Sequence, residues 1–401
     1  MKKLVVMLLV LATVFSCVFA QGSSEAKPKK PEVSEEYLQA QQWAKDNGLD
    51  LDESEEELYK KALAEGGKVV IYTASSRHAK NKADFEKRYP GLELVCYNIN
   101  TGELPEKLRT EYAAGLRNVD IVQSKEVNGE YTKDFFEKGI LLNYRPKSIW
   151  GNVDPSIMTS VTPFFLELTT WFYNDSVYKN GSPVHSWWEL LKPEFDGQII
   201  FQDPASSPTY MTLIATLVRD DVAKMLEEDY KATFGKKIVL AKDEPNAGYA
   251  WINRFLKSKN QISSIADETV KAIGTAPNVK LIGLCASSKI REKEGAMPYL
   301  ATDMVNFKPA LCVPAINFVS IVNGCQHPNG AKLYLKYVMG GEDGKGPGYK
   351  AFNTLGAFPV RPEIEPPKGS DKLSDMTLFT ADYDYYQSSM TDVYDYWLER
   401  L

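Results

Sequence analysis

Short apolar segments of strand length alternate with segments of helical periodicity early in the chain. Residues 68–72, 92–97 and 119–123 have the length and apolar content of buried strands. The segments between them carry apolar residues at helical spacing, and Pro90 ends the first of these helices. Strands that alternate with helices of this length imply βαβ units and a mainly parallel sheet. We therefore expect an α/β fold.

The strand pattern changes in the middle of the chain. Residues 162–173 form a long extended run rich in Phe, Leu, Thr and Trp, which we interpret as a strand that crosses between two lobes. A second α/β unit follows, with strands expected over residues 198–201 and 280–284. Residues 311–322 are apolar enough to form a buried strand that returns to the first lobe. The sequence thus predicts two lobes joined by two crossings.

Length and composition agree with two lobes. The 401 residues, 44% hydrophobic and 25% charged, exceed the size at which single cores stop growing. From residue 372 onward, aromatic and apolar residues form one helical stripe, which we expect to pack against the first lobe. The expected division is an export signal over residues 1–20, a polar tether and N-terminal helix over 21–57, a first lobe over 58–164 plus 306–401, and a second lobe over 165–305.

The first twenty residues have the pattern of a bacterial export signal. Lys2 and Lys3 precede an uncharged apolar stretch, which ends at small residues around Cys17 and Ala20. A polar segment follows at once, so the stretch is shorter than the roughly 20 apolar residues of a membrane span. Cleavage after Ala20 and cleavage before a lipidated Cys17 both fit the pattern. Either cleavage predicts a protein of the periplasm or cell envelope.

Charge and cysteine usage narrow the classes of partner. The net charge of −6 disfavours nucleic acid as a partner. The cysteines of the mature chain form no CxxC pair and have no nearby histidines that would suggest a zinc site. In an oxidising compartment they either remain isolated buried thiols or form a disulfide, for which Cys312 with Cys325 is the pairing we expect. These cysteines are Cys96, Cys285, Cys312 and Cys325.

Four segments, in this order along the chain, resemble the bacterial extracellular solute-binding proteins of the iron, polyamine, thiamine and organophosphate group, which are ferric-ion-binding-protein-like. They are residues 62–76 (ALAEGGKVVIYTASS), 102–123 (GELPEKLRTEYAAGLRNVDIVQ), 187–208 (WWELLKPEFDGQIIFQDPASSP), and 327–331 (HPNGA) with 356–361 (GAFPVR). The resemblance covers residues 58–401 and departs from the family in the N-terminal extension and in the long loop 340–348.

The resemblance implies a two-lobed, type II periplasmic-binding-protein fold with two interdomain crossing strands and the ligand in the hinge cleft. It implies a non-enzymatic role as the substrate-binding component of an ABC importer. The partners are then a small-molecule ligand and an ABC permease of the inner membrane, and we expect the protein to be a monomer without a cofactor.

Ligands of open α/β sheets bind beyond the carboxyl ends of the strands, where helix N-termini present unpaired N–H groups. We therefore expect ligand contacts from the strand-to-helix turns, although ordinary helix capping would explain the same residue types. Hydroxyls, helix N-termini and Arg77 favour an anion that carries a phosphate, phosphonate or carboxylate, whereas Asp203 is expected to brace its turn. The expected ligand-binding residues are Thr73, Ser75, Ser76, Arg77, Ser124, Ser206, Ser207, Thr209, Tyr210 and Ser287.

Two other functions remain open. Ferric iron is the runner-up ligand, because the ferric branch of the resembled family uses an adjacent tyrosine pair. The adjacent pair here, Tyr385 and Tyr386, lies in the C-terminal helical stripe and is better explained by core packing, although Tyr210 and Tyr249 could serve singly. An envelope enzyme using the same cleft is the alternative of another class. The histidines do not favour it, because they are widely separated and match no nucleophile or metal motif: His78, His185 and His327.

Overall fold

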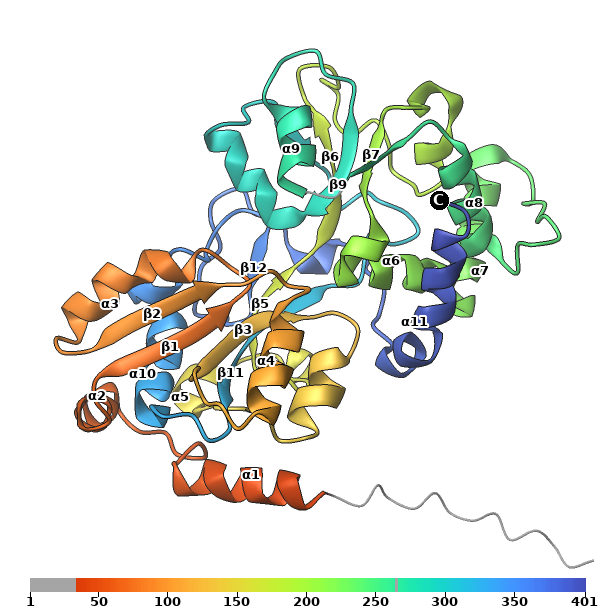
Figure 1. The fold of residues 1–401 in the computed structure, drawn as a ribbon. Helices are drawn as coiled ribbons and strands as arrows, with labels where there is room; N and C mark the ends of the chain where they lie inside the picture. Colours follow the sequence, from red (N-terminus) through yellow and green to blue (C-terminus); the bar gives the residue numbers. More distant parts are fainter. Residues whose placement is uncertain (1–33, 264–265) are drawn as a thin grey trace, which may run out of the picture. The chain divides into compact units, whose positions relative to one another are not determined.

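The expected βαβ alternation builds the first of two sheets in the computed structural model, which describes residues 34–263 and 266–401 (Figure 1). The sheet has the strand order β12-β5-β11-β3-β1-β2, with β4 paired to β11. Strand β1 is parallel to both β2 and β3, whereas β11 runs antiparallel to its neighbours. Its strands are β1 Lys68–Thr73, β2 Glu93–Asn98, β3 Ile121–Glu126, β4 Leu141–Leu142, β5 Pro163–Glu167, β11 Ala315–Val322 and β12 Ala357–Pro359.

The second sheet has the order β10-β6-β9-β7-β8. Strand β7 is parallel to both β8 and β9, and β6 runs antiparallel to β9. Its strands are β6 Thr169–Asn174, β7 Ile199–Gln202, β8 Gln261–Ser263, β9 Ile282–Ala286 and β10 Leu300–Thr302. The helices are α1 Glu35–Asp46, α2 Glu55–Ala64, α3 Lys82–Arg88, α4 Leu104–Ala113, α5 Lys147–Trp150, α6 Pro208–Val218, α7 Asp220–Phe234, α8 Ala247–Lys257, α9 Ala266–Gly274, α10 Pro328–Val338 and α11 Tyr383–Leu398.

The chain passes between the sheets at the two places that the sequence predicts. Leu168 alone separates β5 of the first sheet from β6 of the second, so the run over residues 162–173 is two buried strands in different sheets. The return lies between β10 and β11, and all eight residues of β11 are buried. The two crossings agree with the expected two-lobed architecture.

The C-terminal helix α11 packs against elements of the second lobe. The prediction that it packs against the first lobe is wrong. The Trp397 ring of α11 lies 6.1 Å from the Phe201 ring of β7, centroid to centroid. Tyr386 and Thr216 of α6 share a hydroxyl hydrogen bond of 2.8 Å. An apolar stripe identifies the buried face of a helix but not its partner. In Figure 1, α11 accordingly lies beside α6.

Two buried lysines of α10 hold the N-terminal extension. Lys332 Nζ lies 2.5 Å from Glu53 Oε2 and donates to the Asn47 carbonyl at 2.7 Å. Lys336 Nζ lies 2.9 Å from Asp52 Oδ1. Both lysine side chains are almost wholly buried, at 1% and 0% exposed, so these ion pairs tie the extension to a buried face of α10. Glu35–Leu401 accordingly forms one compact unit.

The four described cysteines, Cys96, Cys285, Cys312 and Cys325, are free thiols, so the expected pairing of Cys312 with Cys325 is wrong. Cys312 Sγ instead accepts a hydrogen bond from the Thr169 amide at 3.3 Å.

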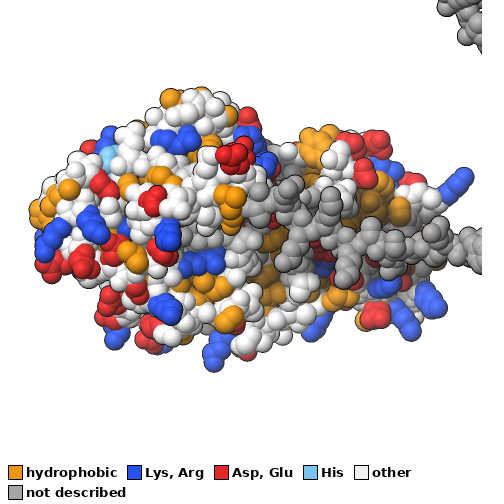
Figure 2. All heavy atoms as spheres, turned by 90° about the horizontal axis from the view of Figure 1, so that it is seen from below, with side chains coloured by type: hydrophobic (Ala, Val, Ile, Leu, Met, Phe, Trp, Pro, Cys, Tyr) orange, Lys and Arg blue, Asp and Glu red, His pale blue; other side chains and the backbone are white. Residues whose placement is uncertain are grey.

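The expected export signal and Cys17 lie outside the described residues. Within the described part, no helix has the length and apolar character needed to span a membrane. Acidic and basic side chains are interspersed on the face drawn in Figure 2.

Candidate ligand-binding site

A cavity of about 220 Å³ lies where β5 passes into β6, and residues from both sheets line it. The first sheet and its loops contribute Asn100, Thr101, Gly102, Lys125 and Ala315. The crossing contributes Glu167, Leu168 and Thr169. The second sheet and its loops contribute Gln202, Ser206, Ser207, Pro208, Thr209, Tyr210, Ala286 and Lys289. The cavity therefore lies between the two sheets, at the first crossing.

Two helices begin at this cavity, one from each side. Thr101 and Gly102 precede α4, and Ser207 is the N-cap residue of α6, with Pro208 at its first position. The Ser207 side chain makes no capping hydrogen bond, so its hydroxyl is not used by the helix. Helix N-termini carry roughly half a positive charge, so the α6 end favours an anion. At α4 the Glu103 and Leu104 amides already donate to the Asn100 carbonyl.

Three charged side chains line the cavity: Lys125 of β3, Glu167 of β5 and Lys289. Glu167 forms an ion pair with Lys125 and accepts a hydrogen bond from the Ser288 hydroxyl. Lys289 pairs with Asp267, which does not line the cavity. The lining side chains thus carry one more positive than negative charge, and each of the two lysines also has an acidic partner.

Glu167 is charged at neutral pH despite its burial. Burial alone would raise the pKa of this carboxyl group, but the positive charges of Lys125 and Arg77, with the hydrogen bonds from Lys125 and Ser288, lower its pKa to about 2. Its side chain is 4% exposed. It is therefore a fixed negative charge at the junction of the two sheets.

Four of the residues predicted to bind ligand come together at the cavity: Ser206, Ser207, Thr209 and Tyr210. The Tyr210 hydroxyl donates to the Leu284 carbonyl at 3.0 Å, so this group already has a partner in the protein. Asp203 Oδ1 accepts from the Ala205 amide at 3.0 Å and braces the turn, as predicted.

The other predicted residues lie outside the cavity lining. Thr73 Oγ1 donates to Gln123 Oε1 at 2.6 Å, and the Ser287 hydroxyl accepts from the Leu168 amide at 3.0 Å. Arg77 Nε donates to Ser75 Oγ at 3.1 Å. These contacts are internal to the fold. Ser124 is buried and Ser76 is exposed, and neither lines the cavity.

The guanidinium carbon of Arg77 lies 5.0 Å from the Phe165 ring centroid and 5.1 Å from that of Phe352. The Arg77 head group is thus held against aromatic rings near the crossing. It contributes positive potential at Glu167 without itself lining the cavity.

Sequence reasoning missed Asn100, Thr101, Lys125, Glu167 and Lys289. For Glu167 the sequence carried a usable signal, because a carboxylate within an apolar strand must find a partner if it is buried. Residues 162–173 contain this single charged side chain. Turn positions alone could not reveal it.

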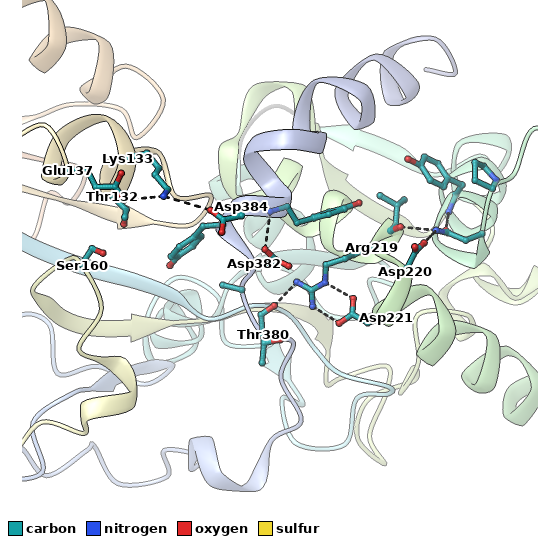
Figure 3. A pocket seen from close by; sticks show the side chains of 17 residues that line it. Thr132, Lys133, Glu137, Ser160, Arg219, Asp220, Asp221, Thr380, Asp382 and Asp384 are labelled. Atoms are coloured by element: carbon teal, nitrogen blue, oxygen red, sulfur yellow. Dashed lines mark hydrogen bonds and ion pairs between the residues drawn. The ribbon is translucent and has the colours of Figure 1, made fainter. Parts of the chain in front are cut away.

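A larger pocket of about 820 Å³ lies beside the start of α11 and is drawn in Figure 3. Five acidic and two basic residues line it, whereas one acidic and two basic residues line the cavity at the crossing. Arg219 Nε and Nη2 lie 2.6 and 2.9 Å from the Asp221 carboxylate, and Arg219 Nη1 donates to the Thr380 carbonyl at 2.9 Å. Lys133 Nζ lies 3.1 Å from Glu137 Oε1 and 3.8 Å from Asp384 Oδ1. This pocket is unsuited to an anion.

The tyrosines considered as iron ligands either lie away from the cavity or, like Tyr210, already use their hydroxyl group in a hydrogen bond within the protein. Tyr386 is buried against Thr216, which agrees with the core packing predicted for the Tyr385–Tyr386 pair. Tyr249 packs against Tyr396 with ring centroids 4.5 Å apart and lines the larger pocket. Within the described residues, no group of three or more His, Cys, Asp or Glu side chains is placed to hold a metal ion.

The fold is that of the type II periplasmic binding proteins. Solved structures similar to this chain include iron-bound HitA from Pseudomonas aeruginosa (TM-score 0.60, 12% identity, covering 82% of this chain and 98% of that one). They include Trichodesmium IdiA (FutA) in complex with iron and citrate (TM-score 0.59, 15% identity, 83% and 99% covered). The periplasmic binding protein AfuA from Actinobacillus pleuropneumoniae, with fructose-6-phosphate bound, is also similar (TM-score 0.58, 18% identity, 83% and 98% covered).

These likenesses confirm, at the level of the fold, the resemblance to the ferric-ion-binding-protein-like group of binding proteins. No protein-family model matches the chain, and no curated protein matches its sequence.

Proposed function

We propose that this chain is the substrate-binding component of an ABC import system and captures a small anionic solute in the cavity between its two sheets. It acts in the periplasm or cell envelope, delivers the solute unchanged to an ABC permease of the inner membrane, and is not an enzyme. Structural neighbours described as periplasmic binding proteins, and one described as the substrate-binding protein of an ABC transporter, support this role.

The charge of the cavity carries the choice of an anion. Lys125 and Lys289 line it, and so do Ser207 and Pro208 at the N-terminus of α6. Amide N–H groups and ammonium groups bind phosphate and carboxylate oxygens by charge-assisted hydrogen bonds. The hydroxyls of Ser206, Ser207 and Thr209 add neutral donors.

Ferric iron is the second candidate, because HitA and the Trichodesmium protein are described with iron bound. Iron would need hard oxygen ligands. Among the described lining residues Tyr210 is the sole tyrosine, and its hydroxyl donates to a backbone carbonyl. Lys125 and Lys289 would repel the cation, so the charge of the cavity favours the anion.

A thermal-shift panel tests the proposal. Sugar phosphates, phosphonates, small carboxylates, polyamines, thiamine and ferric citrate are added separately to the purified protein. An anion at 100 times its Kd should stabilise the fold by about 2.7 kcal/mol, a rise in Tm of at least about one to two degrees, and should be recovered unchanged. Stabilisation by cations alone would contradict the proposal, and conversion of the compound would indicate the envelope enzyme instead.

A further inference from the structure

Glu167 is a carboxylate in a cavity whose other charged groups attract anions. It lines the cavity at the end of β5, where its backbone is paired on both sides, to Ala315 of β11 and to Ala357 of β12. The side chain therefore cannot leave the site without disrupting the crossing strand. An anion that enters the cavity must be accommodated next to this negative charge.

The carboxylate has acceptor positions to spare. Its Oε1 accepts from the Ser288 hydroxyl and its Oε2 from the Lys125 ammonium group. An ionised carboxylate offers about four acceptor positions. About two positions therefore remain for donors that the protein itself does not supply.

We propose that Glu167 selects small anions that also carry a hydroxyl group, by accepting a hydrogen bond from that hydroxyl while Lys125, Lys289 and the N-terminus of α6 hold the anionic group. This inference rests on the proposed function and names the substrate class of the same cavity. A hydroxylated anion places its anionic group at the lysines and its hydroxyl group at Glu167. An anion without a hydroxyl donor is repelled by Glu167 and forms no hydrogen bond with it.

The geometry favours a neutral donor over an ammonium group. Lys125 is paired with Glu167, so a second cation at the carboxylate would lie close to the Lys125 ammonium group and be repelled by it. The cavity volume of about 220 Å³ also limits the ligand. Sites for drug-sized ligands span roughly 300–1,000 Å³, so a compact hydroxylated phosphate or carboxylate fits best.

Matched pairs of probes test the selection in the unmodified protein. Calorimetric titrations compare glycerol 3-phosphate with propyl phosphate, and glycerate with propanoate, because each pair differs chiefly in hydroxyl groups. Loss of a hydrogen bond to a charged group weakens binding by roughly tenfold to a hundredfold. We expect the hydroxylated member of at least one pair to bind at least about tenfold more tightly than its deoxy partner.

The Glu167→Gln variant separates selection from a structural role. It removes the charge that repels the anion and weakens the acceptor, so the deoxy probe should bind more tightly than it does to the wild type, and the hydroxylated probe more weakly. Glu244→Gln is the matched control, since Glu244 is a buried carboxylate outside the cavity that accepts from the Ala241 amide.

Equal binding of both members of each pair by the wild type would overturn the inference even if the variant did not fold. Equal weakening of both probes by Glu167→Gln would also overturn it. Binding of phosphates or carboxylates without hydroxyl preference leaves the proposed function standing and removes only the inference. Binding of cations alone removes both.

Discussion

Trp397 donates its indole N–H to Asp203 Oδ1 at 3.2 Å, which links the last helix of the chain to the turn that carries Ser206 and Ser207. The same Asp203 oxygen accepts the Ala205 amide. The position of two cavity hydroxyls therefore depends on a residue almost two hundred positions further along the chain. This link also explains why α11 belongs with the second sheet.

Trp397→Ala should destabilise the protein by about 3–5 kcal/mol, because it removes a wholly buried indole and leaves a cavity against Phe201 and Phe255. Urea unfolding at equilibrium measures the change. Leu398→Ala is the control, since its side chain is 44% exposed and its loss should cost no more than about 0.5 kcal/mol. Similar losses for the two variants would show that α11 is not anchored by its tryptophan.

The lowered pKa of Glu167 predicts a specific pH dependence of stability. Its pKa is about 2 in the folded protein against an ordinary value of 4.5. Because the folded pKa is the lower one, the contribution is complete above about pH 4.5 and is lost as the pH falls toward 2. A shift of this size is worth roughly 3 kcal/mol.

Chemical denaturation at a series of pH values, with wild type and Glu167→Gln side by side, measures this contribution. The free-energy difference between the two proteins should shrink as the pH falls from 4.5 to 2. A difference that stays constant across this window would contradict the charged, paired state of Glu167.

The sequence predicted the strands and crossings because a buried strand needs a continuous apolar run. Residues 68–72, 92–97 and 280–284 match β1, β2 and β9 to within about two residues. The run over residues 162–173 was correctly interpreted as a crossing, although the break at Leu168 was not visible in its composition.

The site was harder to predict, because its charged residues come from parts of the chain that meet only in the folded protein. Lys125 and Glu167 lie 42 positions apart. The turn rule found Ser206, Ser207 and Thr209, which do line the cavity, but it also selected Thr73 and Ser75, whose hydroxyls bond within the first lobe. Turn chemistry does not distinguish a hydroxyl that binds ligand from one that holds the loop.

The N-terminal extension should be essential to the fold. Glu53→Ala leaves the buried Lys332 ammonium group without its carboxylate partner. Breaking a buried ion pair costs about 3–5 kcal/mol, and we expect a loss at the lower end because Lys332 keeps the Asn47 carbonyl. Thermal and urea unfolding measure the loss. Glu56→Gln, which alters an exposed pair with Lys60, should leave stability unchanged.

Ligand should draw the two sheets together, because the lobes can rotate about the segments that connect them, which are Leu168, residues 303–314 and the segment between β12 and α11. Small-angle scattering with and without a saturating anion measures the radius of gyration, which should fall. An unchanged radius, with binding established independently by calorimetry, would exclude closure.

The most direct test of anion capture in this cavity is a calorimetric titration of glycerol 3-phosphate into two double variants. Lys125→Gln/Lys289→Gln removes both lining cations, whereas Lys87→Gln/Lys224→Gln removes two exposed lysines outside the cavity. Each lost charge-assisted contact should weaken binding by roughly tenfold to a hundredfold. We predict at least about a hundredfold loss for the cavity variant and wild-type affinity for the control. Wild-type affinity in the cavity variant, or an equal loss in both, would contradict the account.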